Sequence, residues 1–306
     1  MKYSACNLER VSRLTPTELL SEQELSLLEI RQVPPFKAED AARRRRKNPE
    51  SPLGKKRRAR KINRILADTF PYAVAELDFE SPFELLVATV LSAQTTDVRV
   101  NSVTPTLFQR YPDAHALAEA PFEAVEEIVQ PLGFYRSKAA SIVRLAQQLT
   151  EDYDGVVPQE LEELVKLAGV GRKTAFVVLG NAFGRPGLTV DTHFGRLSRR
   201  LEFTTHEEPA KVEKDVAELF DSSDWTDLSQ RLIYHGRRIC HSKKPACGVC
   251  PIADLCPSYG IGETDETKAA QLLKYEMAPG REHLHLRFVQ GASRRELRSE
   301  GWSLGA

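Results

Sequence analysis

The chain has 306 residues, and its 43 Lys and Arg residues are balanced by 43 Asp and Glu residues, so the formal net charge is zero. Its 41% hydrophobic and 28% charged residues are typical of a globular protein of one large or two ordinary domains. No apolar run approaches the roughly 20 residues of a membrane span, and the first residues lack the apolar core of a signal peptide. We therefore expect a cytoplasmic protein whose cysteines do not form a disulfide framework.

The basic residues are clustered although the chain is neutral overall. Residues 43–47 are all basic, seven further Lys and Arg residues lie between 55 and 64, and residues 231–244 hold five without a carboxylate. Segregation of this kind can build a basic face that attracts nucleic acid. The alternative is a set of solvated helix surfaces, and charge alone does not separate the two.

Helical periodicity recurs along the chain, whereas strand patterns are hard to find. Residues 1–54 contain one short helical pattern and a charged arm, and dense patterning begins near residue 62. Ser81 and Pro82 are typical of a helix N-terminus. Further helical segments are expected within 121–133, 137–153, 161–168, 172–183, 188–201, 207–220 and 227–240, and the tail beyond Cys256 is weakly patterned. The sequence therefore predicts a mainly helical protein.

Residues 167–176, LAGVGRKTAF, predict two helices joined by a tight glycine turn. Gly169 and Gly171 can adopt positive φ and bring the backbone close to a ligand. The free N–H groups that begin the second helix form an anion site, which a DNA phosphate would occupy without its sequence being read. The alternative is an ordinary helical hairpin, which often contains glycine.

Lys173 lies in the first turn of that second helix, where the helix dipole disfavours a positive charge. A free lysine is almost fully protonated at neutral pH. The helix N-terminus and neighbouring Arg172 both destabilise the ammonium, which favours the neutral amine that a nucleophile requires. The alternative is an exposed lysine that touches a phosphate.

Four of the five cysteines lie within seventeen residues, with the spacing C-x6-C-x2-C-x5-C for Cys240, Cys247, Cys250 and Cys256. Four thiolates suit either zinc or an iron–sulfur cluster. Structural zinc usually shows two C-x2-C-like pairs, and the single pair here favours the larger cluster. Four unliganded core cysteines are improbable at this density, and Cys6 stands apart as an ordinary free thiol.

Together these motifs resemble the endonuclease III family, the bifunctional DNA glycosylase/lyases of the helix–hairpin–helix superfamily. The resemblance rests on LAGVGRKTA, on VDTH at 190–193, on the cysteine spacing, on LSAQTTDVRVN at 91–101 and on GFYRSKAASI at 133–142. It covers roughly residues 55–260. The chain departs from the family at Ala168, where proline is common, and at Phe134, where relatives have leucine; the latter change leaves damage preference open.

The resemblance implies an all-α, two-lobed helix–hairpin–helix glycosylase fold. Residues 76–185 would form a six-helix barrel with the hairpin, and residues 55–75 with 186–260 would form a discontinuous iron–sulfur lobe. Residues 1–54 would be a basic, flexible N-terminal extension, and residues 261–306 a C-terminal tail of unknown role. The implied cofactor is a [4Fe–4S] cluster held by the four cysteines, and it would brace Lys243 and Lys244 against DNA.

The resemblance also implies catalytic roles. Lys173 would attack C1′ of the damaged nucleotide and form a Schiff base that permits β-elimination. Asp191 would stabilise the oxocarbenium-like state or accept the lysine's proton, although it also fits a helix N-cap. His193 would support the site.

Because a base inside a duplex must be flipped out before it can react, the resemblance assigns residues to the gap that it leaves. Gln94 would plug this gap and Phe134 would act as a second wedge. Gly169, Gly171, Arg172, His193 and the two loop lysines would contact DNA, and Ser92 and Tyr135 are further candidates for the pocket. Ordinary surface or core packing is the alternative for Gln94 and Phe134.

The implied function is base-excision repair, with removal of oxidised pyrimidines and strand nicking. Adenine excision is disfavoured because related enzymes carry glutamate where Val90 stands, and they usually lack the hairpin lysine. The alternative is a non-catalytic or monofunctional iron–sulfur DNA-binding relative. We expect a monomer that acts on double-stranded DNA with damaged bases or abasic sites and does not bind a membrane. Its expected location is the bacterial cytoplasm and nucleoid, or the nucleus if the source is eukaryotic.

Overall fold

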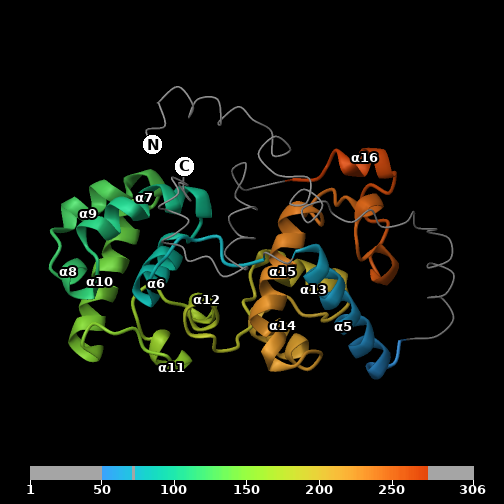
Figure 1. Cartoon of the computed structure of the whole chain (residues 1–306), viewed down its shortest axis with the longest axis horizontal. Coiled ribbons are helices and arrows are strands. Elements are labelled where there is room, and N and C mark those ends of the chain that lie inside the picture. Colours follow the sequence, from blue (N-terminus) through green and yellow to red (C-terminus); the bar gives the residue numbers. More distant parts are fainter. Residues whose placement is uncertain (1–49, 71–72, 275–306) are drawn as a thin grey trace, which may run out of the picture.

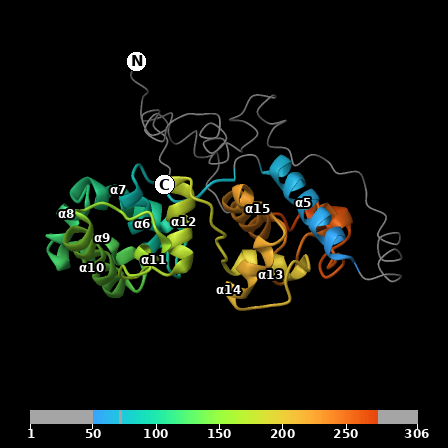
Figure 2. The same ribbon diagram turned by 90° about the horizontal axis from the view of Figure 1, so that it is seen from below.

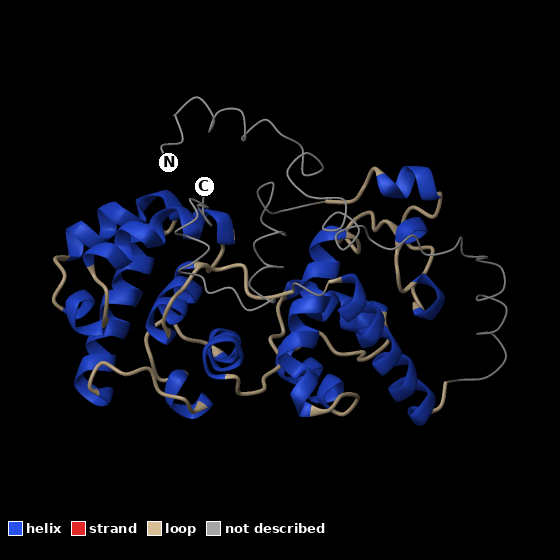
Figure 3. Cartoon of the chain, in the orientation of Figure 1, coloured by secondary structure: helices blue, strands red, loops and turns tan. Residues whose placement is uncertain are grey.

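The computed structural model describes residues 50–70 and 73–274, so most of the expected basic arm and the end of the expected tail lie outside the described residues. The described part consists of helices and loops, with a single isolated bridge between Ala246 and Glu263. Its helices form two groups that lie side by side (Figure 1, Figure 2). The predicted all-α class is therefore confirmed (Figure 3). No helix within the described ranges has the length and apolar character to cross a membrane.

The first group of helices comprises α6 (Pro82–Leu91), α7 (Asp97–Arg110), α8 (Ala114–Ala118), α9 (Phe122–Val129), η2 (Gln130–Leu132), α10 (Tyr135–Tyr153), α11 (Leu161–Leu164) and α12 (Arg172–Phe183). The second group comprises α5 (Pro52–Thr69), α13 (Thr192–Arg200), α14 (Pro209–Ala217), η3 (Ser222–Asp224), α15 (Trp225–Arg238), η4 (Cys247–Val249), η5 (Ala253–Leu255) and α16 (Glu266–Ala270). From residue 50 onward the described chain thus starts in the second group, forms the first and then returns to the second.

Side-chain caps fix where several of these helices begin. The Ser81 hydroxyl accepts a hydrogen bond from the Glu84 backbone N–H at 3.1 Å, and the Glu84 carboxylate accepts one from the Glu80 N–H at 2.6 Å. Pro82 follows at the first helical position, where a missing N–H has no consequence. The expected helix start at Ser81 and Pro82 is therefore confirmed, and the cause is reciprocal capping.

Each group has its own hydrophobic core. Residues 83 and 85–91 of α6 are all buried, because α12 and α10 both pack against this helix. The second core joins α5 to α13 and α15 through side chains such as Ile62, Phe194 and Leu232, each fully buried. It also includes Ala269 of α16, so the second core continues beyond residue 260. The division of the chain at 75, 185 and 260 stays a prediction.

The segment that joins α5 to α6 is clamped by both groups. Asn101 of α7 is 1% exposed, and its amide donates to the Glu76 carbonyl and accepts from the Asp78 N–H, both at 2.9 Å. From the other group, the Tyr234 hydroxyl donates to the Val74 carbonyl at 3.1 Å. The amide of Asn101 therefore satisfies two backbone groups that no regular ladder would satisfy.

We expect the substitution Asn101→Leu to lower the free energy of unfolding by about 2–4 kcal/mol, because it removes the buried partners of two backbone groups while keeping side-chain volume. Urea denaturation followed by far-ultraviolet circular dichroism measures the change. Ser102→Ala, at the next and exposed position of α7, is the control. Equal midpoints for the two variants would show that the hydrogen bonds of Asn101 do not stabilise the fold.

Candidate functional site

The helix–hairpin–helix turn is formed by residues 165–171, between α11 and α12. Gly169 has φ of +75°, a conformation that the choice of glycine here predicts. An added Cβ would lie 3.0 Å from the Val90 side chain and 3.2 Å from the Ser141 side chain. Glycine therefore permits the turn to lie against α6 and α10. Gly171 has φ of −92°, so it does not use the left-handed region, and an added Cβ there meets nothing within 4 Å. The open space at Gly171 leaves its backbone accessible.

The N-terminus of α12 has no side-chain cap. The turn that precedes α12 is bound to α10, because the Gln148 side chain accepts a hydrogen bond from the Ala168 N–H at 2.7 Å. An uncapped helix N-terminus presents N–H groups and a partial positive charge, which suit an anion. This arrangement supports the expected phosphate site, and the roles of Gly169 and Gly171 in it stay a prediction.

Lys173 of α12 and Asp191, which precedes α13, are brought to one place although they belong to different helix groups. Both line two adjacent pockets, which we name the α6–α15 pocket and the α13–α14 pocket after the helices that contribute to them. The α6–α15 pocket has about 520 Å³ of empty space, part of it open to solvent. An amine and a carboxylate therefore face shared space, as the sequence motifs implied.

Asp191 is also the N-cap of α13, so the alternative function of this residue holds as well. One carboxylate oxygen, Oδ1, accepts a hydrogen bond from the Phe194 N–H at 2.7 Å. The other oxygen, Oδ2, makes no hydrogen bond to any described residue. The cap consequently fixes the orientation of the carboxylate and leaves one oxygen for chemistry in the pockets.

Arg172 lies beside Lys173 but its guanidinium is engaged within the protein. It donates to both carboxylate oxygens of Glu213 in α14, at 2.6 and 2.8 Å, and lies 4.8 Å from the centre of the Phe176 ring. The hydrogen bonds to Glu213 raise the pKa of Arg172. The pair joins α12 to α14 across the two groups, and no local pattern indicates it because the partners are 41 residues apart. A DNA contact by Arg172 stays a prediction.

His193 packs within the second group of helices, and it does not line either pocket that contains Lys173. It packs against Gly236 of α15, where an added Cβ would lie 3.0 Å from the His193 Cβ. Burial lowers the pKa of His193, an effect that nearby Asp191 opposes and Arg196 reinforces. The imidazole is therefore neutral at neutral pH, and its Nδ1 lies 3.2 Å from the Arg196 guanidinium.

The four predicted cysteine ligands meet in one place. Cys240 follows α15, Cys247 is the first residue of η4, Cys250 follows η4, and Cys256 follows η5. Their side chains line one pocket whose other walls include the apolar residues Leu197, Ile239 and Ile252. Among the described residues, no three potential ligands converge closely enough to hold one metal ion. Four thiols around a shared apolar space fit an iron–sulfur cluster, which is larger than one ion.

Two arginines of α13 bind the cysteine loop, and no sequence motif predicts this function for them. Arg200 donates to the Cys240 sulfur at 3.2 Å and to the His241 and Ser242 carbonyls at 2.7 Å each. Arg196 donates to the Gly236 and Cys240 carbonyls at 3.0 Å. Their spacing of four residues, which places them on one helix face, is the signal that was available.

The loop lysines differ from each other. Lys244 lies 3.5 Å from the Glu263 carboxylate, whereas Lys243 is exposed and makes no hydrogen bond or ion pair to a described residue. Lys243 is therefore the more available of the two for a phosphate. Contacts of either lysine with DNA stay a prediction.

The two expected intercalating residues share an unusual backbone. Gln94 has φ of +56° and Phe134 has φ of +47°, a region that residues other than glycine seldom adopt. The Phe134 side chain is 71% exposed, and its loop is tied down by Lys138, whose buried ammonium donates to the Leu132 carbonyl at 3.0 Å. An exposed aromatic ring on a constrained loop has the form expected of a wedge.

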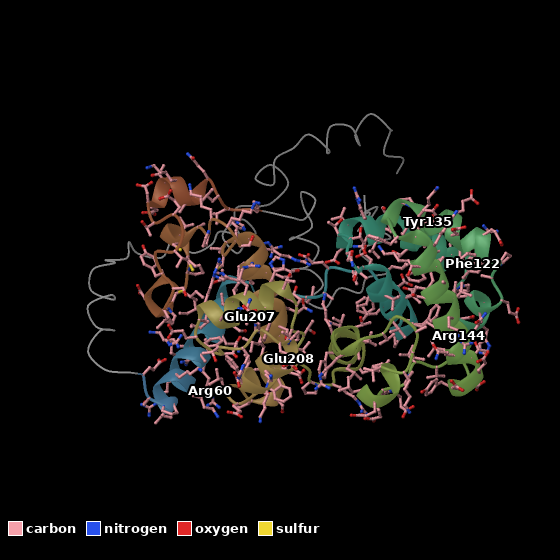
Figure 4. The ribbon with its side chains drawn as sticks, turned by 180° about the vertical axis from the view of Figure 1, so that it is seen from behind. Arg60, Phe122, Tyr135, Arg144, Glu207 and Glu208 are labelled. Carbon is pink, nitrogen blue, oxygen red and sulfur yellow. The ribbon has the colours of Figure 1, made fainter. Side chains whose placement is uncertain are left out.

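Only one of the two further candidates for the pocket reaches it. Ser92 lines the α6–α15 pocket. Tyr135 lines neither pocket that Lys173 and Asp191 share, and it lies at the start of α10 (Figure 4). Tyr135 is therefore placed beside Phe134 instead of beside the candidate catalytic residues.

Comparison with known proteins agrees with this geometry. Residues 87–222 match the family model described as HhH-GPD superfamily base excision DNA repair protein, and residues 240–256 match that of the iron-sulfur binding domain of endonuclease III. Endonuclease III of Synechocystis sp. is 51% identical over 205 residues, which cover 67% of this chain and 94% of that relative.

Two solved structures are similar at 42% sequence identity and a TM-score of 0.64, and each aligns with 66% of this chain. One is described as a non-covalent Endonuclease III-DNA complex, of which 95% is covered. The other is described as a trapped Endonuclease III-DNA covalent intermediate, of which 96% is covered. The alternative of a non-catalytic relative is not favoured.

The helix–hairpin–helix turn, the paired lysine and aspartate and the cysteine loop thus occur together in a chain that aligns with nearly the whole of its relatives. The chain belongs to the endonuclease III family, the base-excision-repair DNA glycosylases with abasic-site lyase activity that carry a [4Fe–4S] cluster.

Proposed function

We propose that this protein removes oxidised pyrimidines from double-stranded DNA and nicks the strand through a Schiff base on Lys173. The observation that carries the proposal is that the Lys173 amine and the Asp191 carboxylate, from different helix groups, line the same two pockets. The lesion class is supported by α6, which contributes Thr89 and Ser92 to the α6–α15 pocket and no carboxylate. Val90, where adenine-excising relatives carry glutamate, packs instead near Gly169.

In the proposed reaction the neutral Lys173 amine forms a bond to C1′ while the glycosidic bond breaks and its electron pair leaves with the base. The base takes up a proton, and the amine loses one. Opening of the sugar ring, with a proton delivered to O4′, gives the iminium ion. Loss of a proton from C2′ then expels the 3′ phosphate by β-elimination. The structure described as a trapped covalent intermediate of endonuclease III supports this route for the related protein.

Asp191 would stabilise the positive charge that develops on the sugar as the base departs. The free oxygen Oδ2 suits this function, since Oδ1 is held by the helix cap. The same carboxylate can accept the proton that Lys173 gives up. Its position at the lip of both pockets allows either contribution.

DNA would be held by groups outside the pockets. The uncapped start of α12 and Lys243 would bind phosphates, and Gln94 with Phe134 would fill the gap left by the flipped nucleotide. The [4Fe–4S] cluster supplies a covalent cross-link for the loop that carries Lys243, and Arg200 ties that loop to α13. We further propose that the protein acts as a monomer in the bacterial cytoplasm and nucleoid.

The nucleophile can be tested by borohydride trapping on a duplex that carries thymine glycol or an abasic site. We expect wild-type protein to form a covalent adduct and Lys173→Gln to lose it by at least about 100-fold, because the imine requires the amine. Lys166→Gln, which changes an exposed lysine of the same turn, is the matched control. Equal trapping by Lys173→Gln would assign the imine to another amine.

The two functions of Asp191 can be separated because asparagine is also a good N-cap. We expect Asp191→Asn to keep the midpoint of thermal unfolding while base release falls about 100-fold, since the charge is lost but the cap is retained. Asp191→Ala should lose both the charge and the helix cap, so base release falls and the protein is destabilised by about 1 kcal/mol. Base release at the wild-type rate by Asp191→Asn would show that the carboxylate is only a cap.

Arg200 can be tested through retention of the cluster. We expect Arg200→Gln to lose iron faster than wild type on dilution into a chelator, because the side chain gives up its hydrogen bonds to the Cys240 sulfur and to two carbonyls of the loop. The visible absorption of the cluster and iron content measure this loss. Arg144→Gln, an exposed arginine of α10, is the control, and identical decay of both variants would refute the function of Arg200.

A further inference from the structure

One face of α15 forms a wall of the α6–α15 pocket. Gln230, Ile233 and Arg237 lie at positions i, i+3 and i+7 of this helix, so they share a face. All three line the pocket together with Lys173 and Asp191. The spacing therefore directs the Gln230 side chain toward the space that the candidate nucleophile also faces.

Three other polar side chains of this pocket already have partners. Arg237 is paired with Glu76, and its guanidinium also donates to the Asp97 carboxylate at 3.1 Å. The Ser92 hydroxyl donates to the Thr89 carbonyl at 2.8 Å, and the Thr89 hydroxyl donates to the Leu85 carbonyl at 2.6 Å. The guanidinium of Arg237 and the hydroxyl groups of Ser92 and Thr89 thus have partners within the protein, whereas Lys173 and the Oδ2 oxygen of Asp191 remain open to the pocket.

Gln230 differs from these neighbours. It is 8% exposed, and its carboxamide makes no hydrogen bond to a described residue. The amide atoms are not among the fully enclosed polar atoms of the described residues that lack a partner, so the side chain is nearly buried while its amide stays open to the pocket. Such a group is suited to a ligand that supplies both an acceptor and a donor.

The α6–α15 pocket suits a ring better than the neighbouring pocket does. Its walls include the apolar side chains of Leu77, Val177 and Ile233, which can contact the faces of a base. The α13–α14 pocket instead contains Arg199 and Glu207, whose charges suit the sugar–phosphate strand and solvent. Since Lys173 borders both, a nucleotide whose C1′ meets the amine can place its base in the first pocket.

We propose that Gln230 is a specificity-determining residue that binds the edge of the flipped pyrimidine. The Gln230 carbonyl would accept a hydrogen bond from the N3–H of the base, and its NH₂ group would donate to an adjacent ring carbonyl oxygen. This pair matches the imide edge of uracil- and thymine-derived lesions, which present N3–H between two carbonyls. The inference rests on the proposed function of the site.

The test compares two reactions of the same holoenzyme, namely base release from a duplex with thymine glycol and strand cleavage at a preformed abasic site. An abasic site has no base, so Gln230 has nothing to bind there. We expect Gln230→Leu, which keeps side-chain volume, to lower the ratio of base release to abasic cleavage about 10- to 100-fold in single-turnover rates. Gln230→Glu should lower the ratio too, since a carboxylate repels the ring carbonyl.

Gln109→Leu, an exposed glutamine of α7, is the matched control, and its ratio should equal that of wild type. Iron content and thermal unfolding verify that each variant is folded. An unchanged ratio in Gln230→Leu would overturn the inference and leave the proposed function intact. Loss of both reactions in equal proportion would also overturn it, since that result indicates general damage to the site. If wild-type protein releases no oxidised pyrimidine, the lesion class fails and the inference fails with it.

A change in the substrate gives a second test that does not depend on folding of a variant. Methylation of N3 removes the donor that the Gln230 carbonyl needs and adds bulk at the same edge. We expect wild-type protein to release N3-methyl thymine glycol at least about tenfold more slowly than thymine glycol, and Gln230→Leu to show a smaller difference. Equal release of the two lesions by wild-type protein would refute recognition of this edge.

Discussion

Lys173 and Asp191 lie on different helix groups, so the site exists only while the two groups are held in register. Gly180 lets α12 approach α15 closely, since an added Cβ would lie 2.7 Å from the Thr226 side chain. The Arg172–Glu213 pair joins α12 to α14, and Arg237 of α15 reaches Asp97 of α7. The Arg237–Asp97 contact is partly buried, so solvent screens it less than the exposed Arg172–Glu213 pair. They keep amine and carboxylate at one shared space.

Helix α13 has a second organising function. Its N-terminus is capped by Asp191, and its C-terminal half carries Arg196 and Arg200, which bind the cysteine loop. A helix is stiff along its axis, so a loop fixed at one end and a carboxylate fixed at the other keep a constant separation. The cysteine loop therefore contributes to the geometry of the site although no cysteine lines either pocket that contains Lys173. In this way a structural centre and a chemical centre share one element.

The sequence by itself determined the all-α class, the helix starts at Ser81 and Asp191, the positive φ at Gly169 and the gathering of four cysteines. Each of these depends on residues close together in the chain: a cap and its helix, a glycine and its turn, thiols within one short loop. The family resemblance added the pairing of Lys173 with Asp191, which local pattern alone does not give. Comparison with relatives then established the family to which the chain belongs.

Only the tertiary structure decided which partners the remaining side chains have. It joined Arg172 to Glu213, Arg200 to the Cys240 sulfur and Asn101 to the segment before α6, and it left the Gln230 amide facing a pocket without a partner among the described residues. These partners are 23 to 41 residues apart in the chain where a pair is formed. Helical periodicity shows that a side chain is on a given face of its helix. What lies opposite that face is set by packing between distant segments, and local sequence does not encode it.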